Sequence, residues 1–236
     1  MNRLAVGCTV FLGCTLSQLR LATVRADQIP SPPRTTTLEV TVDTSKAPDL
    51  AEWGARARRL VEEWHPKICE MLASEGFRPP TKVKLLFRND LDHPAHTSGV
   101  RVKVITISAR WIREHPDDYG MVIHELTHVV QSYPRYEAGW LVEGIADYVR
   151  YIKFERKTRA PRIDPATASY RNGYKTAAYF LRWIEKAYEK ELVSKLNREL
   201  RTSSYTDALF ERYTGKTLDR LWSEYVVTVA KKGTTK

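Results

Sequence analysis

The sequence predicts an α+β fold, because the segments with strand character come first in the chain and those with helical spacing follow. Strand character is found at 37–43, 81–88 and 100–108, where apolar and β-branched residues alternate with polar ones. From residue 109 onward, the apolar residues recur at helical spacing. We therefore expect a small N-terminal mixed or antiparallel sheet with one helix, followed by a mostly helical region.

The elements can be placed in order along the chain. The segment 47–77 has helical spacing, and Pro66 is expected to break or kink its second half. Residues 89–99 are expected to form a polar turn, and a change of phase within 100–108 indicates either a bulge or a tight hairpin. The remaining helices are expected at 109–114, 116–132, 139–154, 174–188, 190–201, 205–213 and 217–229.

Residues 1–26 have the composition of an export signal. Arg3 supplies a basic start, Leu4 to Leu16 form an apolar stretch too short for a comfortable membrane span, and cleavage is expected near Ala26. We therefore expect a secreted protein, extracellular or periplasmic. An N-terminal anchor helix, or a lipoprotein signal ending at Cys8 or Cys14, is the alternative interpretation.

After cleavage, residues 27–36 would form a Pro-rich leader, 37–229 a single domain and 230–236 a basic tail. We expect the domain to be a monomer. Cys69 would be the single remaining cysteine, so the fold cannot depend on a disulfide. Its apolar helical position predicts a buried, inert thiol.

The chain has a net charge of +10, which falls to +7 when the signal removes three arginines and no acid. Lysines and arginines are spread along the whole chain, and no nucleic-acid motif is present, so we expect no nucleic-acid partner. The charge instead favours weak attraction to acidic cell-wall or surface polymers.

The helix expected at 116–132 contains the motif HExxH. His124 and His128 are four residues apart and stack on one helical face, so two imidazole nitrogens can reach one zinc ion. Glu125 is displaced around the helix, where it can face a water molecule. Such a five-residue motif has a chance probability on the order of 1% in a chain of this length. Residues downstream must therefore decide whether it belongs to a metal site.

Those residues exclude one class of zinc site and favour another. A histidine ligand in the pattern HExxHxxGxxH would require Gly and His where the chain has Gln131 and Pro134. The following helix carries Glu143 and Asp147 on one face, which predicts Glu143 as the third ligand and Asp147 as the group that orients a ligand histidine. Gly144 should allow this helix to cross the HExxH helix closely.

Three other residues could complete the site instead. Glu137 lies between the two helices, and His93 and His96 precede a strand with no fixed relation to the HExxH helix. We expect the two histidines to shape a turn, where they could border the cleft.

Two neutral imidazoles and one carboxylate would leave zinc positively charged, with an open position where water can ionise at about pH 7. Glu125 would act as general base and return the proton to the leaving amine, while the metal polarises the scissile carbonyl. A second electrophile usually helps at the oxyanion. Tyr174, at the start of the helix 174–188, is our candidate.

These motifs resemble the basic secretory protein family, peptidases of plants and bacteria. The resemblance extends from about Leu38 to Tyr225 and is carried by DHPAHTSG, HELTHVVQ, GWLVEGIADYVR, GYKTAAYFLRWIE and TGKTLDRLWSEY. It implies a secreted, gluzincin-like peptidase with one zinc ion. In zincins generally, an edge strand before the active-site helix binds the substrate, which by analogy points to Val102–Ser108.

The resemblance assigns the metal ligands to His124, His128 and Glu143, and the catalytic glutamate to Glu125. The leading hypothesis is therefore a zinc endopeptidase acting on peptide or protein substrates. One alternative is a non-catalytic basic protein that binds wall or polyanion and whose zinc is structural or lost. Another is a zinc hydrolase that cleaves a non-protein amide.

Overall fold

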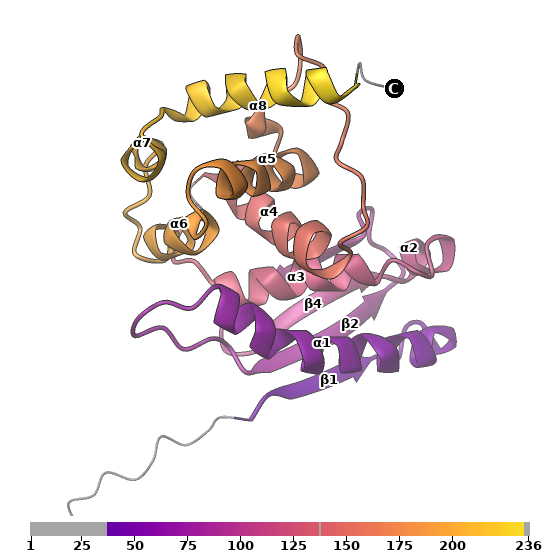
Figure 1. Cartoon of the computed structure of the whole chain (residues 1–236). Helices are drawn as coiled ribbons and strands as arrows, with labels where there is room; N and C mark the ends of the chain where they lie inside the picture. Colours follow the sequence, from indigo (N-terminus) through magenta and orange to yellow (C-terminus); the bar gives the residue numbers. More distant parts are fainter. Residues whose placement is uncertain (1–36, 137, 234–236) are drawn as a thin grey trace, which may run out of the picture. The chain divides into compact units, whose positions relative to one another are not determined.

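The computed structural model describes residues 37–136 and 138–233, so the expected signal peptide, the Pro-rich leader and Glu137 lie outside the described residues (Figure 1). The strands are β1 (Glu39–Asp43), β2 (Lys82–Arg88), β3 (Ala95–Ser98) and β4 (Lys103–Ser108). The helices are α1 (Ala51–Met71), α2 (Ala109–Glu114), α3 (Tyr119–Gln131), α4 (Gly139–Asp147), α5 (Tyr174–Ala187), α6 (Leu192–Arg201), α7 (Ala208–Thr214) and α8 (Leu218–Gly233). Shorter turns are the 3-10 helices η2 (Pro48–Leu50) and η4 (Tyr170–Asn172) and the π-helix η3 (Tyr148–Phe154).

The four strands form one mixed sheet in the order β1-β2-β4-β3. β1, β2 and β4 run parallel to one another, and β3 pairs antiparallel with β4. Sheet residues precede the larger helical part of the described chain, which confirms the expected α+β class.

The segment expected as a polar turn contains a strand, so that prediction was wrong for its second half. β3 carries no alternating apolar residues because it is the edge strand and faces a cleft rather than the core. Neither interpretation of the phase change within 100–108 is correct, because β4 runs unbroken from Lys103 to Ser108 and pairs with β2 in continuous register; the chain reverses before it, between Ser98 and Lys103. In β4, the residues from Ile105 to Ser108 are all buried, so both faces of this interior strand are covered and its apolar residues do not follow a single alternating phase.

Helix α1 continues through Pro66, so of the expected break or kink the break is wrong. Proline removes the hydrogen bond to the carbonyl of Glu62, but both residues lie on the exposed side, where water can satisfy that carbonyl. Cys69 on the same helix is half-buried, and burial raises the pKa of its thiol to about 11. The thiol therefore stays protonated at neutral pH, as an inert side chain would.

The core begins between α1 and the sheet and continues into the helical part. Trp53 of α1 contacts Phe87 of β2 edge to face, with ring centroids 5.8 Å apart. Figure 1 shows α3 beside the sheet, with α4, α5 and α8 following one another away from it. Helix α3 is therefore enclosed between the sheet and α4, and most of its side chains are buried.

Several helix boundaries differ from the sequence prediction. Helix α3 begins at Tyr119 rather than 116, because the Asp118 carboxylate accepts a hydrogen bond from the backbone N–H of Met121 at 3.1 Å and caps the helix. The expected helix 139–154 is α-helical to Asp147 and then widens into η3. Helix α8 continues to Gly233, beyond the expected end at 229. Within the described residues, no helix combines the length and apolar character needed to span a membrane.

Gly144 of α4 permits a close approach, but to α5 rather than to the HExxH helix α3. A Cβ atom at Gly144 would lie 2.7 Å from the Cβ atom of Ala177. The prediction of a close helix crossing was therefore wrong about the partner, because spacing along one helix does not say which neighbour covers that position.

We expect Gly144→Ala to lower the free energy of unfolding by about 1–3 kcal/mol, the usual effect of overpacking a core. The measurement is urea denaturation of metal-free protein. The double variant Gly144→Ala/Ala177→Gly removes the opposing methyl group and should recover part of the loss, so equal destabilisation with and without Ala177→Gly would contradict the contact.

Candidate metal centre

The metal centre is built on α3. His124 and His128 extend from one face of this helix, one turn apart, and their Nε2 atoms lie 3.1 Å from each other. The two rings meet nearly at right angles, with centroids 4.7 Å apart. Helical spacing therefore directs two imidazole nitrogens to one point, as the sequence predicts.

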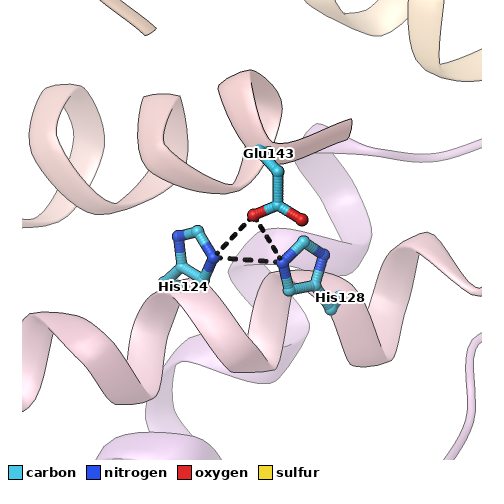
Figure 2. Close-up of side chains that lie close together, drawn as sticks. All are labelled: His124, His128 and Glu143. Atoms are coloured by element: carbon cyan, nitrogen blue, oxygen red, sulfur yellow. Dashed lines mark hydrogen bonds and ion pairs between the residues drawn. The ribbon is translucent and has the colours of Figure 1, made fainter. Parts of the chain in front are cut away.

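Glu143 supplies a third donor atom from α4. Figure 2 shows its carboxylate pointing toward the two imidazoles from the neighbouring helix. Glu143 Oε2 lies 3.2 Å from His124 Nε2 and 3.4 Å from His128 Nε2. In the described part of the chain, these residues form one group whose ligand atoms all lie within 4.8 Å of one another. Two imidazole nitrogens and one carboxylate oxygen at this spacing fit a divalent metal ion.

Asp147 orients the first histidine. Its Oδ1 lies 2.6 Å from His124 Nδ1, and the carboxylate is buried. A carboxylate at this position holds the proton on Nδ1 and leaves Nε2 free to bind a metal. The position expected for Asp147 is thus the one it occupies.

Gln131 orients the second histidine, a role that the sequence prediction missed. His128 Nδ1 lies 2.7 Å from Gln131 Oε1, while Gln131 Nε2 donates to the backbone oxygen of Val142 at 3.0 Å. Because the amide nitrogen is committed to Val142, its oxygen accepts from His128 Nδ1, which leaves His128 Nε2 as the ligand atom. Gln131 also joins α3 to α4. Its position three residues after His128 was the available signal.

We expect Gln131→Met to weaken zinc binding about 10–100-fold, because it removes the acceptor that orients His128. The measurement is a competition titration with a chromophoric chelator. Thr127→Val is the matched control, since Thr127 is also buried on α3 but donates only to the backbone oxygen of Ile123. Equal zinc affinity in Gln131→Met and wild type would contradict this role.

Glu125 lies beside the ligands and outside the group that could hold the metal. It is buried, with 6% of its surface exposed. The Thr97 hydroxyl donates to Glu125 Oε2 at 2.7 Å and lies 2.9 Å from the Glu125 backbone oxygen. Thr97 belongs to β3, the strand expected as a turn, so the sequence prediction missed this contact.

Two tyrosines face the centre from different elements. Tyr174, the expected oxyanion helper, lies in the cleft with its ring centroid 6.3 Å from that of His124, and its backbone φ is 48°. Tyr136 was not predicted; its hydroxyl donates to Glu143 Oε1 at 2.6 Å. The charge of Glu143, followed by burial, raises the pKa of Tyr174. The Tyr174 hydroxyl therefore remains a proton donor at neutral pH.

The acidic groups also determine the charge of the metal-free site. Burial of His124 opposes its protonation, but hydrogen bonds to Asp147 and Glu143 outweigh burial and raise its pKa to about 9. Burial likewise opposes the ionisation of Glu143, yet its contacts with His124 and His128 hold its pKa well below the usual range. The carboxylate is therefore ionised at neutral pH, and a metal ion has to displace a proton from the imidazole pair.

A cleft of about 740 Å³ opens over the centre. It is lined by every site residue that the sequence predicts: His124, Glu125, His128, Glu143, Asp147 and Tyr174. His93 and His96 border it, as expected, with His93 Nε2 2.8 Å from His96 Nδ1, but His96 lies in β3 rather than in the expected turn. These two histidines do not join the ligand group, and Glu137 lies outside the described residues.

The expected substrate strand needs correction. β4 within Val102–Ser108 is an interior strand, paired with β2 on one side and β3 on the other. The edge strand that borders the cleft is β3. The analogy selected the wrong strand because β3 has no apolar pattern by which to recognise it.

Comparison with known proteins assigns the chain to a family. A family model described as peptidase of plants and bacteria matches residues 49–225, a range that contains both helices of the metal centre. No curated protein and no solved structure matches the chain. The family match covers most of the sequence and ends where the resemblance in the motifs ends. The chain therefore belongs to the basic secretory protein family, the peptidases of plants and bacteria.

Proposed function

We propose that this protein is a secreted zinc-dependent metallopeptidase that hydrolyses peptide bonds with Glu125 as general base. The observation that carries the proposal is the convergence of His124 Nε2, His128 Nε2 and Glu143 Oε2 at the base of an open cleft, with Glu125 beside them. Membership of a peptidase family supports the same reaction class.

Zinc is the metal that this donor set favours. Two imidazoles and one carboxylate are a recurrent ligand set of catalytic zinc, and the cleft leaves room for a further ligand. A bound zinc ion would supply the positive charge that polarises the scissile carbonyl and lowers the pKa of a water molecule. Asp147 and Gln131 hold the two imidazoles in the tautomer that binds metal.

The other residues of the site move protons and stabilise charge. The Glu125 carboxylate accepts a proton from the attacking water and returns it to the leaving amine. Thr97 holds that carboxylate through Oε2 and leaves Oε1 for the proton transfer. Tyr174 donates a hydrogen bond to the oxygen that gains negative charge in the transition state.

We expect Thr97→Val to lower kcat about tenfold with little change in KM, because Glu125 loses the hydrogen bond that orients it. Steady-state kinetics on a quenched peptide would measure both constants. Thr106→Val, on the adjacent strand β4, is the control, because Thr106 is buried but does not line the cleft. A large rise in KM with unchanged kcat would contradict an orienting role for Thr97.

The experiment that tests the function combines metal analysis with cleavage. The secreted chain is purified, its zinc is counted, and a peptide library is incubated with the holoenzyme, the chelated protein and the zinc-restored protein. We expect one zinc per chain and cleavage that disappears and returns with the metal. Stoichiometric zinc without cleavage would reject the peptidase and favour the non-catalytic polymer-binding protein. Cleavage restricted to non-protein amides would identify the amidase instead.

A further inference from the structure

Lys103 stands in the wall of the cleft, at the start of β4. Successive residues of a strand face opposite sides, so Lys103 shares a face with Ile105 and Ile107, both fully buried. Thr97 pairs with Ile105 across the β3–β4 hairpin and contacts Glu125 on that same face. Lys103 precedes Ile105 by two residues on this face, so it is the diagonal neighbour of Thr97 across the hairpin.

Within the described part of the chain, Lys103 is half-buried and forms no ion pair. No carboxylate of the described residues lies within 4.0 Å of Lys103, and no acidic group raises its pKa, which burial lowers. Other lysines of the sheet are paired: Lys84 of β2 lies 2.8 Å from Asp43 Oδ2 and Lys82 lies 3.4 Å from Glu39 Oε2. Lys175, in the same cleft, lies over the ring of Tyr151.

A partly desolvated ammonium without a partner is unfavourable, and an anion that enters the cleft would recover the lost solvation. A cation in this cleft would offset negative charge at its centre. This centre holds the carboxylates of Glu125, Glu143 and Asp147, whose three negative charges exceed the two positive charges of one bound zinc ion, so the centre repels an acidic peptide. A cation in the wall near the general base would offset that repulsion on the hairpin side.

We propose that Lys103 is a specificity-determining residue that binds a carboxylate of the substrate, so that the cleft prefers peptides with an anionic group on the side that lies against the β3–β4 hairpin. This inference rests on the proposed peptidase function and specifies its substrate class. The carboxylate has two possible sources, an acidic side chain within the peptide or the α-carboxylate at its C-terminus.

Binding is measured without cleavage, on zinc-loaded Glu125→Gln protein, by fluorescence anisotropy of labelled peptides. The peptides form pairs that differ by Glu or Gln at one position, each with a free or an amidated C-terminus. We expect one position at which Glu binds about tenfold more tightly than Gln, the effect of one charge-assisted contact. If affinity instead falls only when the C-terminus is amidated, and the Glu and Gln peptides bind equally, Lys103 recognises the terminal carboxylate.

The variants assign this preference to Lys103. Lys103→Met should remove it, and Lys103→Glu should reverse it in favour of Lys over Gln at that position. Lys84→Met is the matched control, because Lys84 is half-buried in the same sheet but paired with Asp43 outside the cleft. In active protein, Lys103→Met should raise KM for the peptide with the anionic group and leave kcat unchanged.

An unchanged preference in Lys103→Met, or equal affinity for all paired peptides, would overturn the inference even if the enzyme cleaves peptides. Absence of cleavage with the anionic preference intact would reject the peptidase and retain Lys103 as an anion-binding residue. The two failures are therefore distinguishable.

Discussion

Glu125→Gln is expected to lower kcat about 10³-fold, the usual contribution of a general base, while the protein keeps its zinc. The amide has nearly the shape of the carboxylate but does not accept the proton of the attacking water. Glu125 does not belong to the ligand group, and its orienting contact with the Thr97 hydroxyl can be kept by the amide oxygen. The loss should therefore appear in kcat rather than in metal content or folding.

The measurement is kcat and KM on a quenched peptide, together with zinc per chain for the same sample. Glu185→Gln is the matched control, because Glu185 is a half-buried glutamate that contacts Tyr148 and the backbone of Val193, away from the cleft. A rate close to wild type in Glu125→Gln would reject Glu125 as the base. Loss of zinc would instead assign it to the metal site.

Glu143→Ala is expected to lose stoichiometric zinc, and with it all peptide cleavage. The change leaves two neutral imidazoles and removes the negative charge that holds a divalent cation between α3 and α4. The affinity should fall by more than the roughly 10–100-fold typical of residues that only orient a ligand. Zinc per chain after dialysis, followed by competition titration, measures this effect.

Two control variants test whether the loss of zinc is due to the Glu143 carboxylate itself rather than to residues near it. Tyr136→Phe keeps Glu143 but removes the hydroxyl that donates to it, so most of the zinc affinity should remain. Glu137→Ala removes the other acidic candidate and should leave zinc content unchanged. Full zinc content in Glu143→Ala would mean that a different carboxylate completes the site.

The part of the site that could be predicted from sequence is the part determined by helix geometry. His124, Glu125 and His128 lie within one turn of one helix, so their spacing already determines how they face. Glu143 and Asp147 are likewise four residues apart on the next helix. Asp147 meets His124 as predicted because two histidines and two acids on adjacent helices have few ways to pair.

The fold was predictable to a similar degree. The order of strands and helices followed from alternation and helical spacing, which are local properties of the chain. The strand β3 escaped prediction because it is four residues long, polar and at the edge of the sheet. Helix α1 continues through Pro66 because water can bind the backbone carbonyl that proline leaves without a donor. The sequence did not show this, because it depends on which side of the helix faces the core.

By itself, the sequence determined the class of the site: the pair of histidines, the neighbouring glutamate and the acidic residues of the following helix. The tertiary structure alone decided that Thr97 holds Glu125, that Gln131 joins His128 to the backbone of α4, and that Lys103 lies in the cleft wall with no ion-pair partner among the described residues. The physical reason is distance along the chain. Helical spacing acts over a few residues, whereas these contacts join elements that only the packing of the sheet against α3 and α4 brings together.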